Sequence, residues 1–83
     1  MRLRYFAWLR SRIGCGAEEL KLPEGVATVA DLVEWLKSRG PNYAAALARP
    51  ETVRVAVNHD YVGPGHRLAD ADEVALFPPV TGG

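Results

Sequence analysis

The residues best suited to chemistry stand at the end of the chain. The last seven residues read Phe77-Pro78-Pro79-Val80-Thr81-Gly82-Gly83. Glycine has no side chain and reaches every backbone conformation, so the final pair can enter a channel too narrow for any other dipeptide. The two prolines stiffen the root of the tail and project it away from the preceding strand. The pattern predicts a carboxylate that is presented to another protein's active site; a frayed terminus or a truncated chain is the alternative.

The other residues with catalytic or metal-binding potential are few. Cys15, His59 and His66 are the only cysteine and histidines, and no pair of them has the spacing of metal ligands. Cys15, between Gly14 and Gly16, is either a reactive thiol or a small structural residue, and the second interpretation is favoured. The two histidines fall in predicted loops, where a solvated side chain is the simplest interpretation. We therefore expect neither a bound metal nor a bound cofactor.

Two groups of charged residues leave more than one interpretation open. The acidic group before the tail consists of Asp70, Asp72 and Glu73. It lacks the spacing of an EF-hand loop, so a solvated turn is a better interpretation than a cation site. The basic group near the N-terminus consists of Arg2, Arg4, Arg10 and Arg12. It is either a solvated strand face or a surface that docks an acidic partner.

Length and composition exclude several classes of protein. A chain of 83 residues predicts one domain, 1–83, that buries roughly 60% of the surface of its unfolded chain. Ten basic and ten acidic residues give no net charge, which disfavours tight binding to nucleic acid. A single cysteine excludes an intramolecular disulfide. No apolar run is long enough for a membrane span, and the N-terminus lacks the apolar segment of a signal peptide. We expect a cytoplasmic protein without a membrane or nucleic-acid partner.

The first elements read as a hairpin of two strands. Residues 2–9 alternate in a period of two, which predicts a strand with one set of side chains on each face. Residues 9–16 read as a turn or a short helical turn. Residues 18–22 predict a second short strand, so that a tight connection joins the two.

One helix is clearly marked. Thr28 is a good N-cap, and Asp31 stands three residues later, where the helix dipole favours negative charge. A single apolar stripe follows, made of Val29, Leu32, Val33 and Leu36. Gly40 is expected in the left-handed conformation that ends a helix, and Pro41 prevents continuation. Residues 43–48 then predict a shorter, alanine-rich helix.

The remaining segments predict strands at 52–58 and 73–77 and a short returning strand at 61–62. Hairpin, helix and further strands in this order predict an α+β roll, with a mixed sheet packed on one main amphipathic helix.

An aromatic patch follows if the first and last strands lie side by side in the middle of the sheet. With Leu3, Tyr5 and Ala7 under the helix, Phe6 points to the opposite face. Residues 74 and 76 facing the helix place Phe77 on that opposite face too. Tyr61 is expected to join them, next to the root of the tail. Exposed apolar patches of this kind usually mark a partner.

The tail, with its lead-in Asp72-Glu73-Val74-Ala75-Leu76, resembles the C-terminus of the small subunit of molybdopterin synthase. Three other segments fit the same family: Tyr5-Phe6-Ala7, Thr28-Val29-Ala30-Asp31-Leu32 and Val55-Ala56-Val57-Asn58. The resemblance spans the chain and implies a ubiquitin-like β-grasp fold, with residues 78–83 as a projecting tail.

The same resemblance implies a sulfur carrier that is not an enzyme on its own. A ubiquitin-activating-like adenylyltransferase would use ATP and Mg²⁺ to adenylate the Gly83 carboxylate, and a persulfide donor would convert it to a thiocarboxylate. Within the large subunit, this sulfur would attack a cyclic pyranopterin monophosphate and build the dithiolene of molybdopterin. Catalytic residues are expected on the large subunit, which would form a heterotetramer with the carrier.

The resemblance also assigns roles to the tail and the patch. The residues that would thread the partner's active site are Pro79, Val80, Thr81 and Gly82. The residues that would dock the partner are Phe6, Tyr61, Phe77 and Pro78. Two alternatives stay open: a carrier for another product, such as the thiazole of thiamine or thiolated tRNA, and a ubiquitin-like modifier or binding module.

Overall fold

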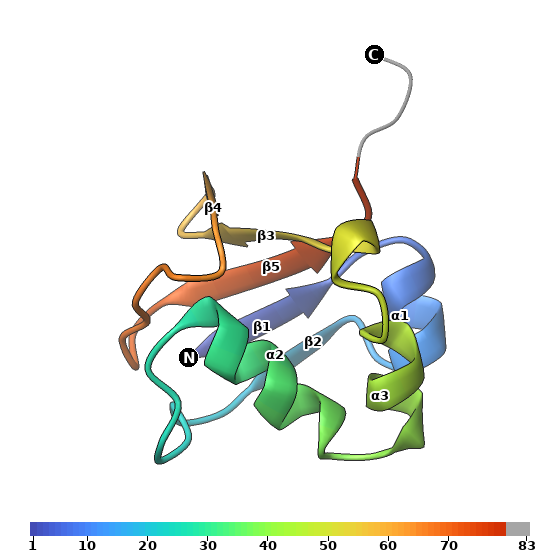
Figure 1. The fold of residues 1–83 in the computed structure, drawn as a ribbon, viewed down its shortest axis with the longest axis horizontal. Coiled ribbons are helices and arrows are strands. Elements are labelled where there is room, and N and C mark those ends of the chain that lie inside the picture. The colour runs from blue at the N-terminus through green and yellow to red at the C-terminus, as the bar shows by residue number, and fades with distance from the viewer. Residues whose placement is uncertain (80–83) are drawn as a thin grey trace.

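The computed structural model describes residues 1–79 (Figure 1). The strands are β1 (Arg2–Tyr5), β2 (Ala17–Glu19), β3 (Arg54–Val57), β4 (Asp60–Val62) and β5 (Glu73–Phe77). The helices are α1 (Trp8–Ile13), α2 (Val29–Lys37) and α3 (Pro41–Ala46), and a 3₁₀ turn, η1 (Pro50–Thr52), precedes β3. The tail residues Val80, Thr81, Gly82 and Gly83 lie outside the described residues, and so do the roles predicted for them.

The five strands form one mixed sheet in the order β2-β1-β5-β3-β4. β1 and β5 are parallel and lie side by side in the middle, with Tyr5 opposite Leu76. The other neighbours are antiparallel. Helices α2 and α3 lie on one side of the sheet (Figure 1). The expected pairing of the first and last strands is confirmed, as is the α+β roll with one main helix.

The core lies between α2 and the middle of the sheet. Because successive strand residues point to opposite faces, alternate residues of β1 and β5 face the helix. The residues that meet there are fully buried: Leu3, Tyr5, Leu32, Leu36, Val74 and Leu76. Val29, Leu32 and Leu36 of the predicted stripe are therefore confirmed as core residues, whereas Val33 is only partly buried.

The predicted N-terminus of α2 is confirmed in detail. Asp31 donates its backbone N–H to the Thr28 hydroxyl at 3.2 Å, and Thr28 donates its own N–H to the Asp31 carboxylate at 3.1 Å. Ala27 donates a second backbone N–H to the same carboxylate. The hydrogen bonds from Ala27 and Thr28 hold the pKa of Asp31 below its ordinary value. This capping box fixes where the helix begins.

The prediction for residues 2–9 is wrong beyond Tyr5. The chain turns at Ala7, which is exposed and has a positive φ of 57°, so Ala7 does not lie under the helix. Residues 8–13 form α1, and Gly14 ends it with a φ of 100°. Leu9 and Ile13 are four residues apart and both buried, so the helix packs them in the core. The connection between the first two strands is therefore helical, the second of the two alternatives expected for residues 9–16.

Other boundaries differ from the prediction by a few residues. β2 spans Ala17–Glu19, and η1 takes the residues expected to begin the next strand, so β3 starts at Arg54. Gly40 is extended, with a φ of 168°, because α2 already ends at Lys37, with Ser38 as its C-cap. Pro41 is then the first residue of α3, a position that suits its fixed φ.

A carboxylate ties three elements together next to the core. Glu18 of β2 accepts hydrogen bonds from the hydroxyls of Tyr5 and Tyr43, at 2.7 and 2.8 Å. Arg39, just beyond α2, donates to it at 2.8 Å. Burial alone would raise the pKa of Glu18, but these three hydrogen bonds outweigh it and hold that pKa below its ordinary value. Burial and the bond to Glu18 raise the pKa of Tyr43 to about 12.

This arrangement predicts how stability depends on pH. A lowered native pKa stabilises the fold above the ordinary glutamate pKa of 4.5, and this contribution is lost as the pH falls through the native pKa. Glu18→Gln should therefore lower the free energy of unfolding by about 1–3 kcal/mol at pH 7. The substitution should also make the free energy of unfolding fall less steeply as the pH is lowered toward 3. Urea titrations at several pH values test this, with the exposed Glu24→Gln as the matched control. Equal slopes for Glu18→Gln and the wild type would contradict it.

Candidate functional site

The face of the sheet opposite α2 carries an aromatic surface. Phe6 follows β1 and donates its backbone N–H to Leu76 at 3.1 Å, so it stands beside the end of β5. Phe6 is 42% exposed and Tyr61 79% exposed, while Phe77 is partly buried. The rings of Tyr61 and Phe77 lie 5.5 Å apart and are tilted by 41°. Three of the four residues predicted for docking therefore reach the surface here, and the docking role of all four stays a prediction.

Two alanines form the centre of this face. In the register of the sheet, Ala56 of β3 lies between Tyr61 of β4 and Ala75 of β5, and Ala75 lies next to Arg4 of β1. Ala56 is 6% exposed and Ala75 is partly buried, so the larger side chains account for most of the exposed area. We call this surface the sheet patch; its members are Phe6, Ala56, Tyr61, Ala75 and Phe77.

Basic side chains border the sheet patch. The Arg4 guanidinium lies 5.5 Å from the centre of the Phe6 ring, a distance suited to a cation–π contact. Arg54 stands opposite Phe77 in the register, and Arg2 lies 4.0 Å from Glu73. Among residues 1–79, neither Arg4 nor Arg54 has a carboxylate within that distance. The patch therefore presents an apolar centre with unpaired positive charge at its edge.

The basic group predicted at the N-terminus is divided between two elements. Two of its members lie on β1, and Arg10 and Arg12 lie on α1. Arg12 is 5.9 Å from the ring of Trp8, which is 38% exposed. The sequence placed Trp8 in a strand and so missed this exposed side chain. The spacing of Leu9 and Ile13, four residues apart, was the sequence feature that could have indicated a helix here.

The root of the tail leaves the sheet next to the sheet patch. Pro78 and Pro79 are partly buried and directly follow Phe77, the last residue of β5 (Figure 1). The structure describes no residue beyond Pro79. The patch is therefore adjacent to the point from which residues 80–83 continue.

Cys15 and the two histidines lie where the non-catalytic interpretations placed them. Cys15 is partly buried and packs against the hydrophobic core, as a small structural residue does. His59 is exposed in the turn between β3 and β4, and His66 is exposed in the loop after β4. Within residues 1–79, no group of three potential ligands is arranged to hold a metal ion.

The acidic group before the tail stabilises loops. Asp72 accepts a backbone N–H from Ala69 at 2.8 Å and a side-chain N–H from Asn58 at 3.0 Å. These bonds hold the pKa of Asp72 below its ordinary value. Asp70 accepts the backbone N–H of Leu22 at 2.7 Å. Asp70 and Asp72 therefore lie in and beside an exposed turn, as the sequence predicted, and their carboxylates also bond neighbouring loops.

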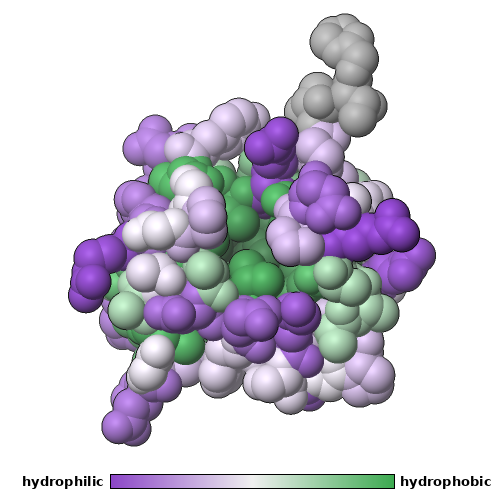
Figure 2. All heavy atoms as spheres, in the orientation of Figure 1, coloured by the Kyte–Doolittle hydropathy of each residue, from purple (hydrophilic) through white to green (hydrophobic). Residues whose placement is uncertain are grey.

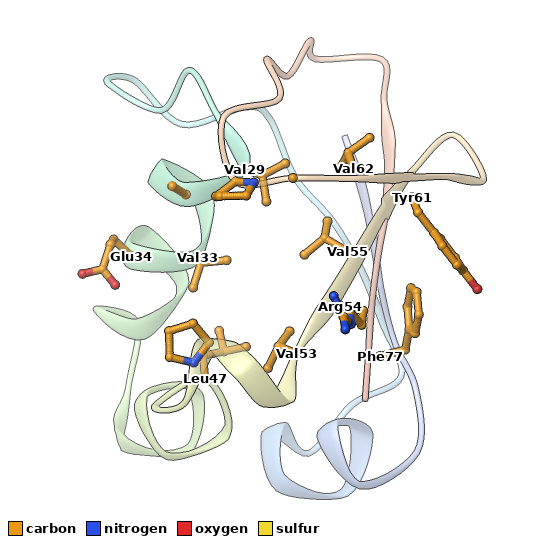
Figure 3. A pocket seen from close by; sticks show the side chains of 14 residues that line it. Val29, Val33, Glu34, Leu47, Val53, Arg54, Val55, Tyr61, Val62 and Phe77 are labelled. Carbon is orange, nitrogen blue, oxygen red and sulfur yellow. The ribbon is translucent and has the colours of Figure 1, made fainter. Parts of the chain in front are cut away.

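A groove between α2 and the β3–β4 side of the sheet was not predicted (Figure 3). Its volume is about 770 Å³. We call it the α2–β3 groove; its apolar walls are Val29, Val33, Leu47, Val53, Val55 and Val62. Tyr61 and Phe77 of the sheet patch also line it. The sequence shows that these residues are apolar, but it does not show how much of their surface the helix leaves uncovered. The groove therefore could not be predicted.

None of the helices within residues 1–79 has the length and apolar character needed to cross a bilayer.

Comparison with known proteins places the chain in a family. The ThiS family matches residues 3–83. The chain belongs to this family. It is 36% identical to the molybdopterin synthase sulfur carrier subunit of Escherichia coli, over all of this chain and 99% of that protein. The subunit of the same name from Haemophilus influenzae is 34% identical, with the same coverage. The family resemblance expected from the tail is confirmed.

Solved structures agree with this assignment. A candidate molybdopterin converting factor, subunit 1, from Pyrococcus furiosus is 36% identical and has a TM-score of 0.75 over 95% of each chain. Small archaeal modifier protein 1 of Haloferax volcanii is 29% identical and has a TM-score of 0.74 over 100% of this chain and 98% of that one. The β-grasp fold expected for the ThiS family member is confirmed.

Neighbouring residues of β5 test the orientation of this strand. Phe77 faces outward and is partly buried, whereas Leu76 is 1% exposed in the core. Leu76→Ala should therefore lower the free energy of unfolding by about 2–5 kcal/mol, and Phe77→Ala by clearly less. Denaturant unfolding of both variants measures the difference. A larger loss for Phe77→Ala would mean that Phe77 belongs to the core.

Proposed function

We propose that the chain is the sulfur carrier subunit of a molybdopterin synthase. The observation that carries the proposal is the sheet patch at the root of a chain that ends in Gly82-Gly83. Relatives similar over their whole length bear the name of this subunit and support the assignment. The carrier would be a protein co-substrate, and catalytic groups would come from its partners.

The chemistry would take place at the Gly83 carboxylate. Its pKa of about 3.3–3.7 makes it an anion at pH 7, and an anion is a poor electrophile. An adenylyltransferase would therefore join it to AMP from ATP with Mg²⁺, releasing pyrophosphate. The terminal sulfur of a persulfide would attack the acyl carbon, and AMP would leave. A thiol would then reduce the resulting acyl disulfide and release the thiocarboxylate.

The tail would enter the partner's active site, and the sheet patch would dock the partner. Pro79, Val80, Thr81 and Gly82 would thread the active site of the large subunit, because their end is slender enough to enter a narrow channel. Phe6, Tyr61, Phe77 and Pro78 would hold the activating enzyme and the large subunit alternately. Carrier and large subunit would form a heterotetramer. Two sulfur transfers to a cyclic pyranopterin monophosphate would build the dithiolene.

A protein modifier is the second candidate function. Its support is the likeness to small archaeal modifier protein 1, which has the same fold over the whole chain. The activated carboxylate would then be joined to lysine amines of other proteins rather than to sulfur. A carrier for thiazole or thiolated tRNA would use the same tail and differ only in the acceptor of the sulfur.

The fate of Gly83 separates these functions. After incubation with the activating enzyme, ATP and a persulfide donor, intact mass should show one oxygen replaced by sulfur. Deletion of Gly83, or Gly82→Trp, should abolish sulfur transfer without lowering the melting temperature, because the core residues described above all precede Phe77. Isopeptide adducts on other proteins would support the modifier instead. A large fall in melting temperature would mean that the tail stabilises the fold.

Charge reversal at the edge of the sheet patch tests docking on an acidic partner. Arg4→Glu should weaken binding to the large subunit on the order of tenfold, because it repels the acidic surface expected to face Arg4. Lys21→Glu makes the same charge change at an exposed residue outside both the sheet patch and the groove beside α2, and should have little effect. Calorimetry at low and high salt measures both variants. Equal affinities would support the solvated interpretation of the N-terminal arginines.

A further inference from the structure

The α2–β3 groove exists because α2 covers only part of the sheet. A helix of nine residues is about 13 Å long, and its core side packs on β1 and β5. Val74 and Leu76 of β5 are therefore fully buried, whereas Val53, Val55 and Val62 on the β3–β4 side are only partly buried. In Figure 3, Val29 and Val33 of α2 point toward these strand residues across the opening.

The exposed walls of the groove are aliphatic. In Figure 2, green apolar atoms lie recessed near the middle of this face and are surrounded by purple hydrophilic residues. A groove of about 770 Å³ is in the size range that accommodates ligands. Covering apolar surface of this kind with another apolar group lowers the free energy of the complex. The lining therefore fits aliphatic side chains.

The charges at the rim are not balanced. Glu34 on the α2 rim is already paired with Lys37, at 3.1 Å. Arg54 also lines the groove, and no carboxylate of residues 1–79 lies within 4.0 Å of it. The charge that an occupant meets is therefore positive, and an acidic group would complement it.

Within residues 1–79, no strand covers the edge of the sheet at this rim. β4 pairs with Val55, Ala56 and Val57 of β3 but does not reach Arg54, which pairs only with Phe77 of β5. An uncovered strand edge favours an occupant in extended conformation, because it can align beside the strand.

The groove is continuous with the sheet patch. Tyr61 and Phe77 belong to the patch and also line the groove. A protein held at the patch therefore lies within reach of the groove, around the end of β3.

From these features we infer that the α2–β3 groove binds an extended segment of the partner protein that docks on the sheet patch. The segment carries aliphatic side chains that contact Val33, Val53 and Val55, and an acidic residue that pairs with Arg54. The inference rests on the proposed function only in taking the large subunit as that partner.

Methyl NMR of the full-length chain tests the inference directly. The chain is labelled at valine and alanine methyls and titrated with the large subunit. Val33, Val53, Val55 and Val62 report on the groove, and Ala75 reports on the sheet patch. Both sets should shift and saturate at the same ratio of the two proteins.

If the methyl signals of the groove valines do not shift during the titration, the inference is overturned. The Ala75 signal then shows whether the proposed function is affected as well. If Ala75 shifts, docking stands and only the groove assignment fails; if it does not, docking on the patch fails too. Groove signals that respond to the concentration of the chain alone would indicate a second copy. Groove signals that change on removal of residues 80–83 would indicate the chain's own tail. Either result overturns the partner segment.

Substitutions in the groove give a second measurement. Val33→Phe fills the groove and should weaken binding to the large subunit on the order of tenfold at an unchanged melting temperature. Ala45→Phe makes a similar addition at an exposed site of α3 and should not weaken it. Arg54→Glu should also weaken binding, and Arg54→Lys should retain most of it. Wild-type affinity for both Val33→Phe and Arg54→Glu would overturn the inference.

Discussion

Burial of one face of the sheet beneath α2 is the interaction on which the other features depend. Leu3, Tyr5, Val74 and Leu76 are withdrawn from water against Leu32 and Leu36. Because strand side chains alternate, this burial forces their neighbours, including Phe77, to the other face. The sheet patch is thus a geometric consequence of the core. The groove has the same origin, since it begins where the cover of the helix ends.

Much of this arrangement could be predicted from local signals. The capping residues Thr28 and Asp31 located the start of α2, and the alternation in 73–77 located β5 with the correct face inward. Placing Phe6 and Phe77 on the outer face then followed from the central position of their strands. These predictions succeeded because each depended on a local pattern: a capping pair three residues apart, or apolar residues at every second position.

The errors arose where a residue satisfied two patterns or where cover by another element mattered. Leu9 continues the alternation of β1 and is also four residues before Ile13, and tertiary burial of that pair favoured the helix. Gly40 does not take the expected left-handed conformation because α2 ends at Lys37 and its C-cap is already Ser38. The α2–β3 groove could not be predicted, because it depends on the length of α2 relative to the width of the sheet.

Pairing of β1 with β5 joins the two ends of the described sequence, and it has a consequence for biosynthesis. The middle of the sheet cannot form until Phe77 has left the ribosome, since β1 has no parallel partner before then. Contacts between residues so distant in sequence also slow folding, because a long loop must close first. The middle of the sheet therefore forms only after β5 has been synthesised. The sheet patch, which takes Ala75 and Phe77 from β5, is likewise incomplete in any nascent chain that lacks this strand.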